Sequence, residues 1–129
     1  MKIEAPVIEV RAATEAEVYA QAALSLGRLL AGGGPMTQSV ERTLEPAGHD
    51  RVSQLVALLR DVLTIFYDER LILCAIEVRV GTPFSATAGF APWDPARHQA
   101  GVEVASVSYG GARFEPDGDG WRGVVNLDG

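Results

Sequence analysis

Basic residues are scarce in this sequence and are not clustered. Lys and Arg together number 11 among 129 residues, against 17 acidic residues, which gives a formal net charge of −6 and a pI near 4.8. Lys2 is the only lysine, and no two arginines are adjacent. Because proteins bind phosphate backbones mainly through clustered lysine and arginine, we expect no strong direct binding of nucleic acid.

Cysteine and the common catalytic motifs are also nearly absent. Cys74 is the only cysteine, so it forms no internal disulfide, and its place in the apolar run LILCAIEV predicts a buried core position. The sequence has no CxxC pair, no HExxH and no Gly-rich phosphate loop, since the three glycines from Gly32 are followed by Pro35. The two histidines are His49 and His98. These absences favour a protein that is not an enzyme.

Long hydrophobic runs are missing as well. No stretch approaches the roughly 18 consecutive apolar residues that a membrane-spanning helix needs, and the first ten residues, MKIEAPVIEV, carry acidic side chains. We therefore expect no signal peptide, no membrane contact and a cytoplasmic location. The content of hydrophobic residues, 47%, and of charged residues, 22%, is that of a globular protein, so residues 1–129 are expected to form a single domain.

The pattern of apolar residues predicts two helices and six strands. Thr14 is a candidate N-cap with acidic residues in the turn after it, and the glycines from Gly32 end this first helix. Asp50 precedes a second helix with a wide apolar stripe. The predicted order is strand 3–12, helix 14–30, strand 36–44, helix 50–66, strand 71–80, strand 84–91, strand 101–115 and strand 121–128.

This order of elements favours an α+β fold. The last four predicted strands form two hairpins, one across the turn at 81–83 and one across the Asp- and Gly-rich turn PDGDG at 116–120. Strands that follow helices in this way are typical of a largely antiparallel sheet with two main helices packed on one face.

Carboxylates and one imidazole are the candidates for chemistry. Asp94 and His98 lie in one predicted loop, Glu103 follows on the next strand, and Asp128 precedes the terminal carboxylate of Gly129. Oxygen donors of this kind suit Ca²⁺ or Mg²⁺, and with the histidine they suit a transition metal. The alternative is that each is an ordinary loop or strand-end residue.

Three blocks of the sequence resemble the archease family, the small proteins that assist the RtcB-type RNA ligase. The segment VRAATEAEVYAQAALSLGRLL, 10–30, resembles the first strand end and first helix of the family. The segment LVALLRDVLTIFYDERLIL, 55–73, is similar to its second helix, with Asp61 in the acidic place. The tail segments DPARHQAGVEVASVSYGG, 94–111, and WRGVVNLD, 121–128, resemble its histidine-led segment and terminal strand.

The resemblance implies a function in tRNA splicing or RNA repair. A protein of this family is expected to be a cofactor of the ligase that promotes its metal- and GTP-dependent guanylylation, and not an enzyme in its own right. The implied partner is an RtcB-type RNA ligase, and the implied cofactor is a divalent ion, Ca²⁺, Mg²⁺ or Mn²⁺.

The resemblance also implies site residues, and some of them match. Asp128 and Gly129 are the candidate metal ligands, and His98 matches the histidine that leads the third block. Tyr109 matches the tyrosine of the family strand KAVTYH, and Ser108 stands at its threonine. Asp61 is a further candidate.

Other positions depart from the family. Val7 stands where the family motif His-Thr-Ala-Asp has its metal-binding aspartate, Ala105 replaces the lysine of KAVTYH, and Gly110 replaces its histidine. Valine cannot bind a metal, so the implied site is incomplete and loss of the metal stays open. Glu4 and Glu9 are the candidates to replace the missing carboxylate.

Three functions therefore follow from the sequence. The first is an archease-like cofactor of an RtcB-type ligase. The second is a diverged binding module of the same fold, without metal and without ligase activation. The third is an enzyme in which His98 acts as acid or base beside Asp128. The sequence does not identify the ion, the oligomeric state or the docking surface.

Overall fold

A computed structural model describes residues 6–32, 37–94 and 101–129. Glu4 and His98 lie outside this range. The elements follow the predicted order of strand, helix, strand, helix and four strands: β1 (Val7–Ala12), α1 (Glu15–Ala31), β2 (Val40–Leu44), α2 (Arg51–Glu69), β3 (Leu71–Arg79), β4 (Ser85–Pro92), β5 (Ser106–Asp117) and β6 (Gly120–Asp128).

Both helices begin at the predicted caps. The Thr14 hydroxyl accepts a hydrogen bond from the backbone N–H of Glu17 at 3.2 Å, and α1 ends at Gly32, which takes the left-handed conformation with φ 72°. Asp50 accepts from the N–H of Ser53 at 2.8 Å, while the Ser53 hydroxyl accepts from the N–H of Asp50. This reciprocal capping box fixes the start of α2.

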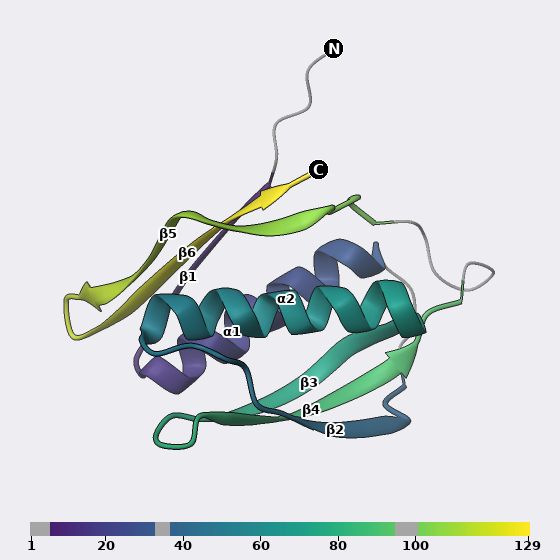
Figure 1. The fold of residues 1–129 in the computed structure, drawn as a ribbon, viewed down its shortest axis with the longest axis horizontal. Helices are drawn as coiled ribbons and strands as arrows, with labels where there is room; N and C mark the ends of the chain where they lie inside the picture. The colour runs from purple at the N-terminus through teal and green to yellow at the C-terminus, as the bar shows by residue number, and fades with distance from the viewer. Residues whose placement is uncertain (1–5, 33–36, 95–100) are drawn as a thin grey trace, which may run out of the picture.

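The strands form two antiparallel sheets with the helices between them (Figure 1). One sheet has the order β1-β6-β5 and the other β2-β4-β3. Each sheet therefore has the helices on one face and solvent on the other. The predicted α+β class and antiparallel pairing are confirmed, and the structure adds the division of the strands into two sheets.

The first part of the predicted strand 101–115 is not a strand, because β5 begins only at Ser106. Beyond that start β5 is bulged. Ser108 pairs with Asn126 and Arg113 with Val124, so four residues of β5 face a single residue of β6. Gly111, with φ 77°, allows this bend, and the Asn126 amide donates to the Gly110 carbonyl at 3.1 Å.

Cys74 is half-buried rather than part of the core. It lies at an irregularity in the β3–β4 pairing between Leu73 and Ala75, and its thiol contacts the Gly89 carbonyl at 3.4 Å. Burial raises the pKa of the Cys74 thiol. A thiol of this kind stays protonated near neutral pH and is a poor nucleophile.

Within the described ranges, neither helix has the length and apolar character that crossing a membrane requires.

Candidate functional site

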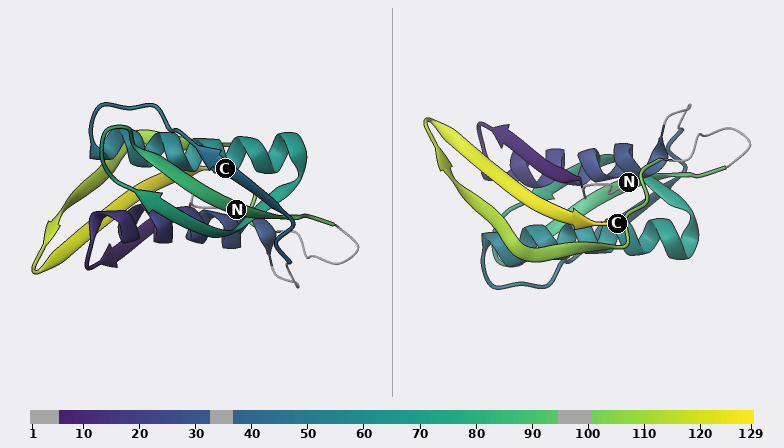
Figure 2. Two further views of the ribbon diagram at one scale, coloured as in Figure 1. Left: turned by 90° about the horizontal axis from the view of Figure 1, so that it is seen from below. Right: turned by 90° about the horizontal axis from the view of Figure 1, so that it is seen from above.

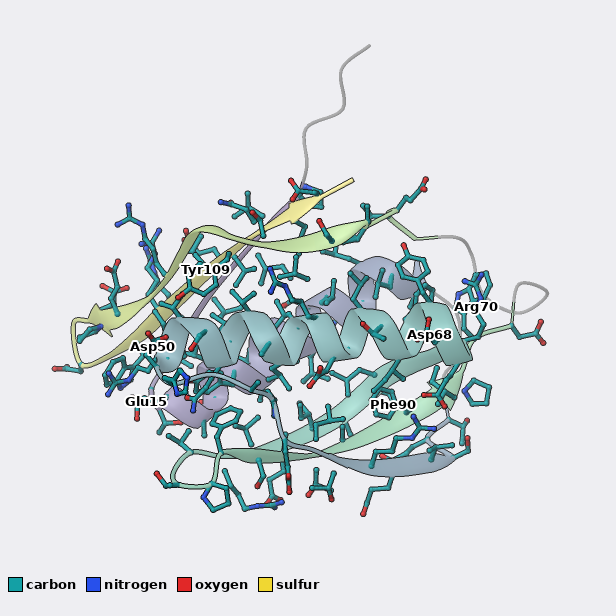
Figure 3. The ribbon with its side chains drawn as sticks, viewed as in Figure 1. Glu15, Asp50, Asp68, Arg70, Phe90 and Tyr109 are labelled. Atoms are coloured by element: carbon teal, nitrogen blue, oxygen red, sulfur yellow. The ribbon has the colours of Figure 1, made fainter. Side chains whose placement is uncertain are left out.

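One pocket brings together residues that are far apart in the sequence. It has a volume of about 530 Å³ and lies between α2 and the start of β5, near the end of β6. Figure 3 labels Tyr109 on the β5 side of α2. The lining residues are Arg60, Leu63 and Thr64 of α2, Ala105 to Tyr109 at and just before β5, and Asp128 of β6. Ser108, Tyr109 and Asp128 thus meet in one place.

Side chains of α2 bond to the backbone at the start of β5 and in the residues just before it. Arg60 donates from Nε and Nη2 to the Val107 carbonyl at 3.2 and 3.1 Å. The Tyr67 hydroxyl donates to the Val104 carbonyl at 2.7 Å and accepts from the Val104 N–H at 3.3 Å. These bonds occupy backbone groups that another strand would otherwise use. They fix the position of Ser106 to Tyr109 relative to Asp128.

Arg60 and Tyr67 were not recognised from the sequence as site residues. Both occur in the amphipathic pattern of α2, where a polar residue on the exposed side is expected whatever its role. Their contacts are with residues 47 and 37 positions away along the chain. Only the packing of α2 against β5 reveals their role.

Asp128 is exposed at the end of β6 and has a single polar contact with a described side chain. Its carboxylate accepts a hydrogen bond from the Ser106 hydroxyl at 3.3 Å. Gly129, which follows it, is also exposed. The pocket therefore presents a carboxylate that no cation of the described residues neutralises.

Val7 stands at the place where the resemblance puts an aspartate, which leaves a gap among the carboxylates there. Its side chain is 56% exposed, and it pairs with Asn126 across β1 and β6. Since strand residues alternate between faces, Val7, Asn126 and Asp128 all point to the outer face of the sheet. A carboxylate at position 7 would lie near Asp128, whereas the valine present there offers no ligand.

Glu9 does not fill this gap. Its carboxylate is bound to Arg122 at 2.7 Å, and this ion pair lowers the pKa of Glu9. Arg122 also contacts Glu115 at 3.3 Å, so both carboxylates belong to a charged row across the outer face of the sheet. Glu9 is therefore engaged elsewhere.

A divalent ion does not fit the donors that the described residues offer. Ca²⁺ takes six to eight oxygen ligands and Mg²⁺ needs near-octahedral coordination. Near Asp128 the described residues supply one side-chain carboxylate and a few hydroxyl or terminal oxygens, and no group of three or more His, Cys, Asp or Glu in the described ranges could hold an ion. The described residues of the pocket therefore do not complete a metal site.

Asp61 lies on α2 but does not line the pocket. It is half-buried, and burial raises the pKa of its carboxyl group. Glu103, the other acidic candidate near this region, is exposed. The functional roles inferred for Asp61, Ser108, Tyr109 and Asp128 stay predictions.

Replacing Asp61 by asparagine is expected to stabilise the protein near neutral pH by about 0.5 kcal/mol, a small value because the side chain is still partly solvated. Since the folded state raises the pKa, the carboxyl group costs no stability below the ordinary aspartate pKa of about 3.9, and the cost develops as the pH rises through the folded-state value. Urea unfolding of wild type and D61N at about pH 7 and pH 3 measures this. Equal differences at both values would contradict it.

The fold and the pocket define a class of small α+β domain in which two antiparallel sheets enclose two helices and β6 ends at the pocket. The archease protein family (MTH1598/TM1083) matches residues 6–128. The chain therefore belongs to the archease family.

Two solved structures show the same fold. Protein 1598 of Methanobacterium thermoautotrophicum, solved in solution, superposes with a TM-score of 0.72 at 20% identity, over 95% of this chain and 90% of that chain. The crystal structure of TM1083 from Thermotoga maritima, described as an archease and possible chaperone, gives 0.64 at 14% identity, over 100% and 96%. A comparison with curated proteins gave no match.

Proposed function

We propose that this archease acts as an accessory protein of an RtcB-type RNA ligase in tRNA splicing or RNA repair and promotes guanylylation of the ligase. The observation that carries the proposal is the make-up of the pocket. Its α2 residues come from the second block of family resemblance, and its β5 and β6 residues come from the tail blocks. Segments that resemble the family and are distant in sequence thus converge on one exposed surface.

The pocket suits contact with a partner protein. Tyr109 is 51% exposed and offers an aromatic face and a hydroxyl group, which are favoured at the centre of interfaces. Arg60 and Asp128 add one charge of each sign, and neither has an ion-pair partner among the described residues. The net charge of −6 favours approach to a basic partner such as an enzyme that binds RNA.

The proposal assigns the bond-making steps to the ligase. The described lining of the pocket contains hydroxyl groups, one carboxylate and one guanidinium, without a histidine or cysteine that would activate a nucleophile. The contribution of this chain is to bind the ligase and favour its competent conformation. The metal and GTP dependence then belongs to the ligase reaction.

The second candidate is a binding module that has lost ligase activation. Val7 and Ala105 favour it, because the first leaves position 7, the diagonal neighbour of Asp128, without a carboxylate and the second leaves the pocket without the family lysine. The two candidates differ in whether the protein accelerates guanylylation.

The test is GTP-dependent guanylylation of the ligase from the same cell, with and without this protein, in Mg²⁺, Mn²⁺ and Ca²⁺. We expect acceleration, reduced severalfold in D128A because the exposed carboxylate is lost from the pocket. Asp119→Ala is the matched control, since Asp119 is an exposed acid on the β5–β6 hairpin outside this pocket.

No acceleration by folded protein that still binds the ligase would select the binding module. Absence of both binding and acceleration would overturn the proposed function. Turnover of RNA or nucleotide by the purified protein, abolished in H98A, would instead support an enzyme.

A further inference from the structure

The two edges of the β1-β6-β5 sheet differ in whether side chains bond to their outward backbone groups. On the β5 side, Arg60 bonds to the backbone carbonyl of Val107 in β5, and Tyr67 bonds to the backbone of Val104 just before the strand. The β1 edge has no such cover from any described residue. Figure 2 (right) shows this sheet from above, with β1 at one edge and β5 at the other.

The hydrogen-bond pattern tells which backbone groups of β1 are free. The N–H of Leu127 donates to the Pro6 carbonyl at 3.0 Å, so Pro6 faces β6. Because successive residues of an antiparallel strand alternate in direction, Ile8 and Val10 also face β6, whereas the backbone groups of Val7, Glu9 and Arg11 face away from it. Three residues of β1 thus present N–H and C=O groups at an open edge.

We infer that the β1 edge pairs with β1 of a second copy of this chain, antiparallel and about a two-fold axis at Val10, to give a six-stranded sheet across a dimer. In this register Glu9 lies opposite Arg11 of the second copy, and Arg11 lies opposite Glu9. All four residues have outward backbone groups, so the backbone bonds can form in this register. Within one chain Glu9 contacts Arg122 at 2.7 Å and Arg11 contacts Asp117 at 3.0 Å, so the pairing across the axis adds an opposite charge beside each of these exposed ion pairs. Because the interface is two-fold symmetric, each of these contacts occurs twice.

Other registers of self-pairing are less favourable. An axis at Glu9 sets Glu9 opposite its own copy, and like charges directly opposite destabilise a strand pair. An axis at Ile8 sets the charge of Glu9 opposite the apolar Val7. If the axis passes between two neighbouring residues, each residue whose backbone groups face outward lies opposite one whose groups face β6. The backbone bonds between the two copies then cannot form.

The surface beside β1 leaves room for the second strand. A hollow of about 320 Å³ lies along β1 and α1 and is lined by Val7, Ile8, Glu9, Ser25, Arg28 and Leu29. In the proposed register the small side chains of Ala12 and Ala13 of the second copy come opposite Ile8 and Val7. Pairing would also bury part of the Val7 side chain, which is 56% exposed.

Sedimentation equilibrium of the intact protein and of R11P tests the inference. A proline at position 11 removes an outward N–H but leaves the β1–β6 ladder intact, since Arg11 does not donate to β6. We expect the wild type to reach twice the chain mass of 13.7 kDa with rising concentration, and R11P to stay at the mass of one chain. R11A, which keeps the N–H, is expected to form a dimer with a severalfold higher dissociation constant.

Arg11→Glu provides a second variant in which every N–H is retained. It sets Glu9 opposite a glutamate twice across the axis, so the like charges are expected to weaken the dimer. Circular dichroism verifies that each variant folds. A wild type that stays monomeric at all concentrations would overturn the inference. The inference would also be overturned if R11P and R11E formed dimers with the same dissociation constant as the wild type, because the contact would then lie elsewhere. Binding of the ligase is measured separately, so failure of the dimer leaves the proposed function standing.

Discussion

Replacing Tyr19 by alanine is expected to lower the free energy of unfolding by about 3–5 kcal/mol, the range for truncating a large buried aromatic residue. Tyr19 lies on α1 with 0% of its surface exposed. Its ring packs on Phe84, before β4, and on Phe114 of β5, with ring centroids 4.7 Å apart in both cases. One side chain therefore joins both sheets through the helix layer, and its loss leaves a cavity between them.

Tyr19→Phe separates the packing contribution from the polar one. The hydroxyl group donates at 3.4 Å to the Arg51 carbonyl and the Gln54 side chain, so these bonds are long, and their loss is expected to cost no more than about 1 kcal/mol. Urea unfolding of the two variants measures both values. A loss of similar size in Y19F and Y19A would show that the hydroxyl group, and not the ring, carries the stability.

The helices could be predicted because their signals are local. The side chains of Thr14 and Asp50 accept hydrogen bonds from backbone N–H groups only three residues further along the chain. Gly32 takes the left-handed conformation at the end of α1. The β5–β6 hairpin was also visible from the turn residues between the two strands, although β5 continues to Asp117 and the turn is shorter than predicted.

The division into two sheets could not be read from the sequence. It depends on the pairing of β1 with β6 and of β2 with β4, each of which joins strands separated by at least one helix. Alternation of apolar residues identifies a strand and its buried face, but it does not identify the neighbouring strand. The β5 bulge likewise depends on Asn126 and Gly110, which are distant in sequence.

The candidate site was predictable only in part, for a similar reason. Ser108, Tyr109 and Asp128 do line one pocket, and the resemblance to the family was the signal that selected them. Arg60 carried no such signal, since an arginine on an amphipathic helix is ordinary until its carbonyl partner on β5 is known. Asp61, selected by the same resemblance, does not line this pocket.

Replacing Val7 by aspartate is expected to raise the affinity for Ca²⁺ or Mn²⁺ by about ten- to hundredfold, because affinity for such ions increases with the number of charged oxygen ligands. Val7 pairs with Asn126 on the outer face, so Asp128 is its diagonal neighbour on β6. Diagonal positions lie about 7–8 Å apart, within reach of one ion held between two carboxylates. The exposed position of Val7 makes the substitution tolerable for folding.

Isothermal titration with each ion measures the effect, and two further variants locate it. V7N has the shape of the aspartate without its charge, so a smaller gain is expected from it. V7D combined with D128A is expected to return to the wild-type affinity, because the ion then loses its second carboxylate. If V7D binds no more tightly than the wild type, positions 7 and 128 do not share an ion, and the β1–β6 face is not the metal-binding surface that the family resemblance implies. If the gain appears and depends on Asp128, the geometry for an ion is retained in this chain and the side chain at position 7 is what it lacks.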